Sequence, residues 1–415
     1  MRRQILAVVT VLTVATAARG ANLDQNRLLQ DIPFNFGNPG AKSLGLGGAF
    51  IGRADDASAA EANPAGLTSI TKREATLEIR SAETARNVNV GGTSPDFTFD
   101  NVADRSTAVP SFLSVVLPTQ GAGVYSFYYH KLLSFELDSQ NAAIDTGSGL
   151  ALAAGRSRVD YKAETFGGAA AWSLGGLSLG GAVRYQRFQP GSSSIVTLSS
   201  GATRTLEIRD SDSAISYSAG LRWSTPTDNF SVGGVYKKGA DYTVEEARTT
   251  GTSTTASPSA FNVPDVFGAG ISFRPVTPLR INIDAVRVSY SSLLEGFNPA
   301  LRNTCDTAGR NCAQNYDVPD VTEIHAGLQW TIVTNSAPIA IRAGAWRDPA
   351  HGLKFVEDSS LSSAGELAAA VYKGGEDVNH ITAGFGYLGT AFEVNVGYDA
   401  ADSGDTLAAS MLFRF

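Results

Sequence analysis

Apolar and polar side chains alternate along most of this chain, in segments of roughly ten residues separated by gaps of two lengths. From Glu74 to Phe415 fourteen such segments can be counted, and long and short gaps follow one another without a break. Successive side chains of a strand point to opposite faces, so each segment would have one apolar and one polar face. Short turns at one end and long loops at the other are typical of an antiparallel barrel in a membrane.

The segment at residues 319–333 shows the alternation clearly. Ile324 and Leu328 fall on one face, and Glu323 and Gln329 fall on the other. A soluble sandwich could bury the same apolar face, so the ends of the segments decide between the two folds. Aromatic residues recur there: Trp172, Tyr185, Trp223, Tyr236, Phe273, Tyr290, Trp330, Trp346, Tyr387 and Tyr398. Such belts mark the two surfaces of a bilayer, and we therefore predict an all-β protein, a fourteen-stranded antiparallel transmembrane β-barrel.

Gap lengths predict the orientation of the barrel. The short gaps are residues 117–121, 174–176, 225–229, 274–278, 333–337 and 388–390, and several contain the Pro, Gly, Asn or Asp of tight turns. The long gaps are residues 83–107, 132–159, 190–204, 239–261, 291–318 and 348–376, and they are rich in Ser, Thr, Gly, Asp and Asn. We expect the short turns in the periplasm and the long loops outside a bacterial outer membrane. An even number of strands then returns both termini to the periplasm.

The first residues have the features of a secretory signal peptide. Arg2 and Arg3 precede an apolar run at residues 5–18, which is too short for a membrane-spanning helix, and residues 15–17 offer a small-x-small cleavage site. We expect residues 1–17 to be removed on export. The formal net charge of the chain is −7 at pH 7 and becomes more negative without the two arginines, which argues against nucleic acid as a partner.

Cysteine and histidine are scarce. Cys305 and Cys312 lie in one Gly-containing loop, and two close cysteines in an exported chain most often pair, so we expect a disulfide there. Two cysteines alone are too few for a structural metal site. The four histidines are His130, His325, His351 and His380, and none accompanies a nucleophile motif. We therefore expect no metal, no cofactor and no enzymatic activity.

Residues 18–73 precede the first barrel segment and are too many for a simple tail. Their glycines do not form a nucleotide-binding loop. Gly45-x-Gly47 has Phe50 where the third glycine of a dinucleotide loop would stand, and the run from Gly47 to Gly52 lacks the lysine that follows in a phosphate loop. A leading segment of this length favours a plugged lumen over the open channel of a general diffusion porin.

The stretch from Leu44 to Leu67 resembles the hatch of the FadL/TodX family of outer-membrane transporters for hydrophobic compounds. The residues that carry the resemblance are Gly45, Gly47, Gly48, Asp55, Asp56, Asn63, Pro64, Ala65, Gly66 and Leu67. Residues 320–328, residues 341–349 and the aromatic C-terminus also match the family. The resemblance implies a barrel at residues 74–415 plugged by residues 18–73, and uptake of hydrophobic compounds, long-chain fatty acids foremost, by a monomer surrounded by outer-membrane lipid.

The hatch residues have structural as well as functional interpretations. Glycines suit a plug packed inside a barrel because they lack a Cβ and tolerate positive φ. Asp55 and Asp56 either form a solvated turn or pair with arginines of the lumen, and the sequence leaves both possibilities open. We expect Asn63 and Pro64 to fix a turn into the first strand and to hold the plug in register.

In the FadL/TodX family the ligand leaves sideways through the wall at the third strand, which here would include residues 121–130. The candidate residues for such an opening are Gly121, Gly123, Tyr125, Phe127, Tyr128 and Tyr129. Aromatic side chains on both faces of one strand are unusual where one face should be polar. This pattern supports a lateral opening.

A ligand with a carboxylate would need a cation in the lumen, and a guanidinium binds a carboxylate in a two-point fork. Four arginines fall on inward phases: Arg184, Arg222, Arg280 and Arg342. Each of them could bind ligand, or could pair with an acid of the wall or of the hatch and so fill a wet lumen. The sequence does not separate these two roles.

A second function shares this architecture. Barrels that resemble the PorV-type proteins have a similar Asn-Pro-Ala-Gly-Leu hatch and act as docking platforms for secretion or surface-attachment systems. Residues 63–67 fit both functions, so we carry the docking platform as the alternative to transport.

Overall fold

The structure of the protein is a computed structural model. It describes residues 37–84, 89–90, 97–100, 105–141, 144–145, 151–152, 155–197, 203–208, 210–250, 252–295, 316–356 and 374–415. The signal peptide expected at residues 1–17 and the disulfide expected between Cys305 and Cys312 lie outside these ranges. Both therefore stay predictions.

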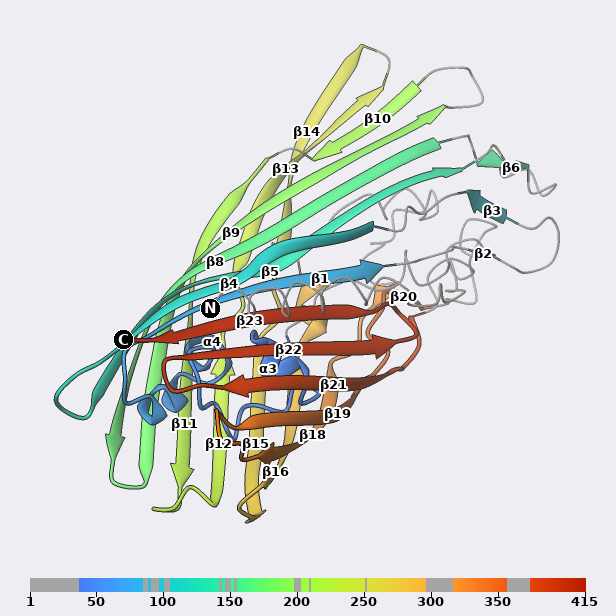
Figure 1. The fold of residues 1–415 in the computed structure, drawn as a ribbon. Helices are drawn as coiled ribbons and strands as arrows, with labels where there is room; N and C mark the ends of the chain where they lie inside the picture. Colours follow the sequence, from blue (N-terminus) through green and yellow to red (C-terminus); the bar gives the residue numbers. More distant parts are fainter. Residues whose placement is uncertain are drawn as a thin grey trace, which may run out of the picture.

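Fourteen antiparallel strands close into a barrel (Figure 1). In chain order they are β1 (Glu74–Thr84), β4 (Arg105–Pro118), β5 (Gly123–Asn141), β8 (Gly155–Leu174), β9 (Leu177–Thr197), β11 (Asp212–Ser224), β12 (Phe230–Lys237), β15 (Val266–Val276), β16 (Leu279–Val288), β18 (Val321–Ile332), β19 (Ile339–Asp348), β21 (Val378–Leu388), β22 (Phe392–Ala401) and β23 (Thr406–Arg414). The barrel closes where β1 pairs with β23, from Glu74↔Arg414 to Ala82↔Thr406. The predicted strand number and antiparallel order are confirmed.

One side of the wall is taller than the other (Figure 1). On that side β5, β8 and β9 have 19, 20 and 21 residues, whereas β16, β19 and β22 on the other side have 10 each. The remaining strands are β2 (Asn89–Val90), β3 (Phe97–Asp100), β6 (Ile144–Asp145), β7 (Ala151–Leu152), β10 (Thr203–Ile208), β13 (Asp241–Thr250), β14 (Ser253–Asn262), β17 (Tyr316–Asp317) and β20 (Lys354–Phe355). Of these, β10 pairs with β9 and β13, and β13 pairs with β14, so the wall continues past the barrel.

The long gaps expected as loops at residues 132–159, 190–204 and 239–261 therefore contain strand, and the expectation of plain loops was wrong there. Ser and Thr made these segments look like loops. Backbone hydrogen bonds do not depend on side-chain polarity, and a polar segment still pairs where its neighbour runs alongside it.

The barrel turns its apolar side chains outward. In β18 Ile324 is 51% exposed and Leu328 48%, whereas Glu323 and Gln329 point inward and are buried. A soluble protein would bury such side chains in a core, and a continuous apolar exterior marks contact with lipid. The predicted apolar-out, polar-in alternation is confirmed for this strand. No helix among the described residues is long and apolar enough to cross a bilayer.

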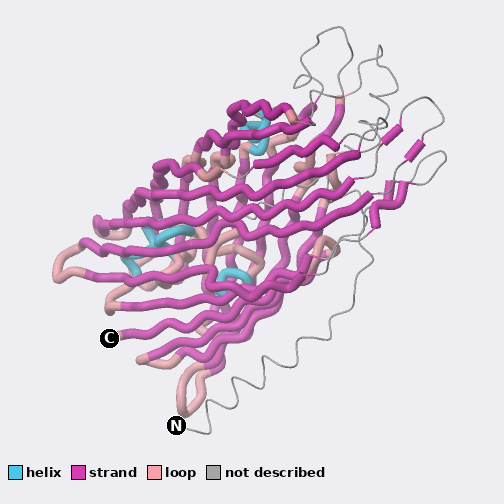
Figure 2. Tube along the Cα trace, turned by 90° about the horizontal axis from the view of Figure 1, so that it is seen from above, coloured by secondary structure: helices cyan, strands magenta, loops and turns pink. Residues whose placement is uncertain are grey.

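Residues 37–73, which we call the hatch segment, lie within the barrel, where Figure 2 shows their helices between the strands. The segment forms two short α-helices, α3 (Ala41–Leu44) and α4 (Ala59–Ala62), and the 3₁₀ helix η1 (Pro64–Ser69). A further 3₁₀ helix, η2 (Tyr290–Leu294), follows β16. Leu46, Phe50 and Leu67 are fully buried. The hatch segment thus has its own apolar interior, packed against the inner face of the wall.

Candidate functional site

The hatch segment approaches most of the wall closely at glycine positions. Eight strands between β9 and β22 each present an inward glycine, and we call these residues the glycine belt: Gly180, Gly220, Gly233, Gly270, Gly327, Gly344, Gly384 and Gly397. A Cβ at any of them would lie 3.0 Å or less from an atom of the hatch segment. Gly344, for example, faces the backbone nitrogen of Gly47, and Gly327 faces the carbonyl of Leu46. Glycine inside a strand often marks such a close approach of another backbone.

The hatch glycines complete this close packing. A Cβ on Gly45 would lie 2.9 Å from the Cα of Gly384 in β21. Gly47 and Gly48 adopt positive φ, +65° and +77°, which residues with a side chain rarely adopt. The ring of His325 on β18 holds this turn, because its Nδ1 lies 2.8 Å from the Gly47 carbonyl oxygen. The hatch glycines are therefore placed where both the turn and the wall require them.

Asn63 fixes the hatch segment to the wall at β11. Its Nδ2 donates to the carbonyls of Ile51 at 3.1 Å and Leu221 at 3.2 Å, and its Oδ1 accepts from the backbone N–H of Ala65 at 3.2 Å. The residue caps η1, and Pro64 follows at the first position of that helix, where its missing N–H costs nothing. Asn63 thus joins two parts of the hatch segment to a barrel strand with one side chain.

Asp55 and Asp56 find most of their partners within the hatch segment. Asp55 pairs with Lys42 at 2.6 Å and with Arg53 at 2.8 Å. Asp56 accepts from the backbone N–H of Ser58 at 2.9 Å and from its hydroxyl at 2.5 Å. Asp56 therefore forms a turn, and the cations that neutralise Asp55 come from the hatch rather than from the arginines of the wall.

Arg222 and Arg280 both hold Asp228, which lies in the short turn between β11 and β12. Arg222 donates to one carboxylate oxygen at 2.6 Å, and Arg280 donates to the other at 2.7 Å. Partial burial raises the pKa of Asp228, but the hydrogen bonds and charges of the two arginines outweigh it and hold that pKa below its usual value. Arg222 also donates to the hatch carbonyl of Gly52 at 3.2 Å. Through Asp228 and Gly52, Arg222 ties the turn to the hatch.

Arg342 links the wall to the hatch through an amide. Its Nε donates to Gln329 Oε1 at 2.9 Å, and the same oxygen accepts from Arg53 of the hatch segment at 3.1 Å. The side chain is buried, and its two terminal nitrogens have no hydrogen-bond partner among the described residues.

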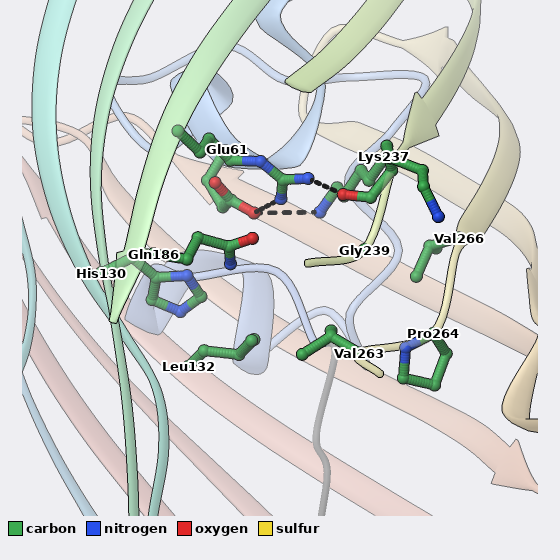
Figure 3. Close-up of a pocket in the computed structure, with 11 residues that line it drawn as sticks. Glu61, His130, Leu132, Gln186, Lys237, Gly239, Val263, Pro264 and Val266 are labelled. Carbon is green, nitrogen blue, oxygen red and sulfur yellow. Dashed lines mark hydrogen bonds and ion pairs between the residues drawn. The ribbon is translucent and has the colours of Figure 1, made fainter. Parts of the chain in front are cut away.

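Arg184 differs from the other three arginines because it borders a cavity, whose lining is drawn in Figure 3. The cavity has a volume of about 20 Å³. Its lining residues are Glu61, His130, Leu132, Arg184, Gln186, Lys237, Lys238, Gly239, Val263, Pro264 and Val266. Glu61 comes from the hatch helix α4, and the others come from β5, β9, β12, β15 and the connections beside them. Hatch and wall therefore share one site.

The cavity has a charged side centred on Glu61. One oxygen of Glu61 accepts from Arg184 Nη1 at 3.2 Å and lies 3.8 Å from Lys237 Nζ. The other oxygen accepts from the hydroxyl of Tyr128 at 2.8 Å. Two cations thus face one buried carboxylate, and His130 Nδ1 and Arg184 Nε have no partner among the described residues. Buried polar groups nearly always have a partner, so a water or a polar ligand group fits here.

The opposite side of the cavity is apolar. Val263 and Val266 line it and belong to a buried cluster that also contains Phe188, Tyr242 and Leu133. The ring of Phe188 stacks on Tyr242 with centroids 5.2 Å apart. The site therefore combines a cationic corner with an apolar side that is backed by a buried aromatic cluster.

The wall beside the cavity is interrupted. The ladder between β4 and β5 ends at Phe112↔His130, and beyond this pair the described part of β4 pairs with β1 alone. Next to the end of the ladder β5 has a bulge at Leu132, between the paired residues Lys131 and Leu133. β4 carries Pro110 there, which has no N–H to donate. His130 and Leu132 also line the cavity, so the interruption borders the site directly.

The residues expected at a lateral opening lie on both sides of the wall. Tyr125 and Phe127 point outward, and Tyr129 donates its hydroxyl to Glu164 at 2.8 Å, whereas Tyr128 points inward to Glu61. Gly123 begins β5, and Gly121 lies in the turn before it. From Val124 to His130 β5 is paired with both β4 and β8, so the interruption begins only after His130.

Solved structures of similar fold cover 92% of this chain. A FadL homologue of Pseudomonas aeruginosa is 13% identical, with a TM-score of 0.66 over 99% of its own chain. The toluene transporters TbuX of Ralstonia pickettii and TodX of P. putida are 15% and 12% identical, each with a TM-score of 0.59 over 99% of its chain. The chain has the fold of these transporters. No protein-family model and no curated protein sequence matches it.

Within this FadL/TodX fold, sequence reasoning found Arg184 but missed its partners. Glu61 was hidden in an alanine-rich run, and Lys237 is the last residue of a strand that has no other charged residue. The glycine belt was also missed, although its signal is visible in the sequence. Each belt glycine stands at a position of an alternating strand where a polar, inward-pointing residue is expected. A glycine at such a position often marks the close approach of another chain segment.

Proposed function

We propose that this protein is an outer-membrane transporter that takes up hydrophobic compounds through a plugged barrel, with long-chain fatty acids as its principal substrates. The observation that carries the proposal is the site shared by hatch and wall, where an apolar aromatic cluster adjoins two cations in a closed lumen. The apolar exterior places the barrel in a membrane. The similar fold of the toluene transporters favours transport over the docking-platform alternative.

A carboxylate ligand would place its hydrocarbon chain among Phe188, Tyr242 and their neighbours, and its head group beside Arg184 and Lys237. A guanidinium with an unused Nε and an ammonium within reach are the donors that such a head group requires. Arg222 and Arg280 are occupied by Asp228, and Arg184, unlike Arg342, lines the cavity, so we assign the ligand role to Arg184.

For release, we propose that the ligand leaves sideways between β4 and β5. This is where the ladder ends, where both strands are irregular and where the wall borders the cavity. Because the hatch segment would close the direct route through the lumen, an apolar ligand would pass into the membrane rather than into the aqueous periplasm. In this scheme Tyr128 and Tyr129 border the exit.

The test is uptake of a tritiated long-chain fatty acid by cells that lack their own outer-membrane transporter and express this chain. We expect uptake well above the empty-vector control and no increase in permeation of a hydrophilic sugar. Arg184→Ala should lower the uptake of the acid, and Arg187→Ala, an outward arginine on the same strand, serves as its control. Permeation of the sugar without uptake of the acid would indicate an open porin and would overturn the proposal.

A further inference from the structure

We propose that Glu61 is a built-in carboxylate that occupies the anion site of the cavity, so that a ligand carboxylate binds by displacing it. The proposal rests on the proposed function and goes further, since it names the hatch residue that sets the preference between acids and neutral compounds. Glu61 would thus determine specificity from inside the plug.

The geometry around Glu61 is that of a bound anion. Its carboxylate accepts from Arg184 Nη1 at 3.2 Å and from the hydroxyl of Tyr128 at 2.8 Å, with Lys237 Nζ at 3.8 Å. The donors come from three different barrel strands and converge on one group of the hatch segment. Any other carboxylate that reached this corner of the cavity would use the same donors.

The size of the cavity makes the two carboxylates competitors. At about 20 Å³ it holds roughly one water molecule, and a carboxylate head group does not fit beside Glu61. Removing Glu61 from its place would leave two buried cations with no counter-ion, which is strongly unfavourable. An incoming acid supplies the missing negative charge, whereas a neutral hydrocarbon does not.

Glu61 belongs to the part of the hatch segment that could move. It lies on the four-residue helix α4, whose alanines pack against side chains of the wall in a cluster that includes Phe112 and Tyr128. No glycine of the belt faces a residue of α4. Displacing Glu61 would therefore shift α4 next to the interrupted wall, while the contacts of Leu46 and Gly47 with the belt stay in place. Ligand charge would be coupled to movement of the plug on the exit side.

The experiment compares the binding of laurate and of methyl laurate, its uncharged ester, to purified full-length protein. For Glu61→Gln we expect laurate to bind at least about tenfold more tightly than to the wild type, the effect of about one charge-assisted hydrogen bond. The ester should bind both proteins within about twofold. Glu61→Ala also removes the carboxylate and leaves the donors Arg184, Lys237 and Tyr128 in place, so it should tighten laurate binding in the same direction and decides the question if Glu61→Gln fails to fold.

Asn63→Ala is the matched control for a loosened hatch, because it changes no charge. The Nδ2 of Asn63 donates to the carbonyls of Ile51 at 3.1 Å and Leu221 at 3.2 Å, so its removal loosens the hatch directly after α4. If this variant tightened the binding of laurate, but not of the ester, as much as Glu61→Gln does, loosening rather than charge would be the cause and the proposal would fail. Equal changes for acid and ester in Glu61→Gln, or no change for either, would overturn the role of Glu61 and leave transport intact. Binding of neither probe by any variant would overturn both proposals.

Discussion

The two sides of the barrel hold the hatch segment in different ways. From β9 to β22 the glycine belt lets the wall approach the hatch closely, and side chains such as Asn63 and Asp284 add hydrogen bonds there. Across β4, β5 and β8 the contact consists of side chains, such as Phe112 and Tyr128 against the alanines of α4. The wall on this second side is also interrupted where the β4–β5 ladder ends.

This difference indicates which part of the plug can yield. A backbone packed on glycine has no side chain that can change rotamer, so the contact is either intact or lost as a whole. Side chains packed on alanine can rearrange at moderate cost, and a strand that is unpaired on one edge can bend. We infer that the belt side anchors the hatch, and that the α4 side opens toward the interrupted wall.

The largest effect should come from breaking the anchor. Gly344→Val would place side-chain atoms against the backbone of Gly47 and Leu46, so the hatch should be forced off the wall at a cost of about 1–3 kcal/mol or more. Trypsin should then cleave at Lys42 and Arg53, which are buried in the wild type. Gly168→Val is the control, because its Cβ points outward and meets only Phe127 at 3.9 Å. If trypsin cleaved Gly344→Val as slowly as Gly168→Val, the belt would not hold the hatch.

A smaller effect is expected at the end of the belt. Asn63→Ala removes three hydrogen bonds and leaves the carbonyls of Ile51 and Leu221 without this donor, which should destabilise hatch docking by about 1–3 kcal/mol. Tryptic cleavage at Arg53 should become faster than in the wild type and remain slower than in Gly344→Val. Asn229→Ala provides the control, because Asn229 is exposed and its side chain makes no hydrogen bond within the described part of the chain. Cleavage as fast as in Gly344→Val would mean that the cap, rather than the belt, is the main anchor.

The smallest effect concerns Asp228, in the turn between β11 and β12, and it depends on pH. The arginines lower the pKa of Asp228 in the folded protein below its ordinary value of 3.8. Its stabilisation is therefore fully present above that value and is lost as the pH falls through the lowered folded-state pKa. Asp228→Asn should lower the melting temperature at neutral pH, and the difference from the wild type should shrink below about pH 4. Thr227→Ala should show no such pH dependence, and a constant difference for Asp228→Asn would contradict the assignment.

The architecture could be predicted from the sequence because membrane and lumen impose a period of two on every strand. In β18 the outward Ile324 and the inward Glu323 follow from this period alone. The height of the wall could not be predicted. Residues 241–250 are polar, and their pairing depends on whether β10 and β14 run beside them.

The site was only partly predictable for the same reason. The alternation identified Arg184 as a residue that points inward. It does not indicate how deep in the barrel a side chain lies or which hatch residue it meets. Arg184 meets Glu61 across 123 residues of sequence, and Arg222 and Arg280 converge on a turn residue, Asp228, that the pattern left as a simple connection. Convergence of distant residues on a plug is set by packing, which no local pattern encodes.

Hydrogen exchange with and without laurate tests the central claim most directly, because it reports on both sides of the hatch in one sample. Saturating laurate should increase exchange of the amides in α4 and in residues 130–134 of β5, and should leave residues 41–52 on the glycine belt as protected as before. Loss of protection at residues 41–52 equal to that of α4 would show that the whole plug moves together and would contradict the division of the barrel into an anchoring and a yielding side.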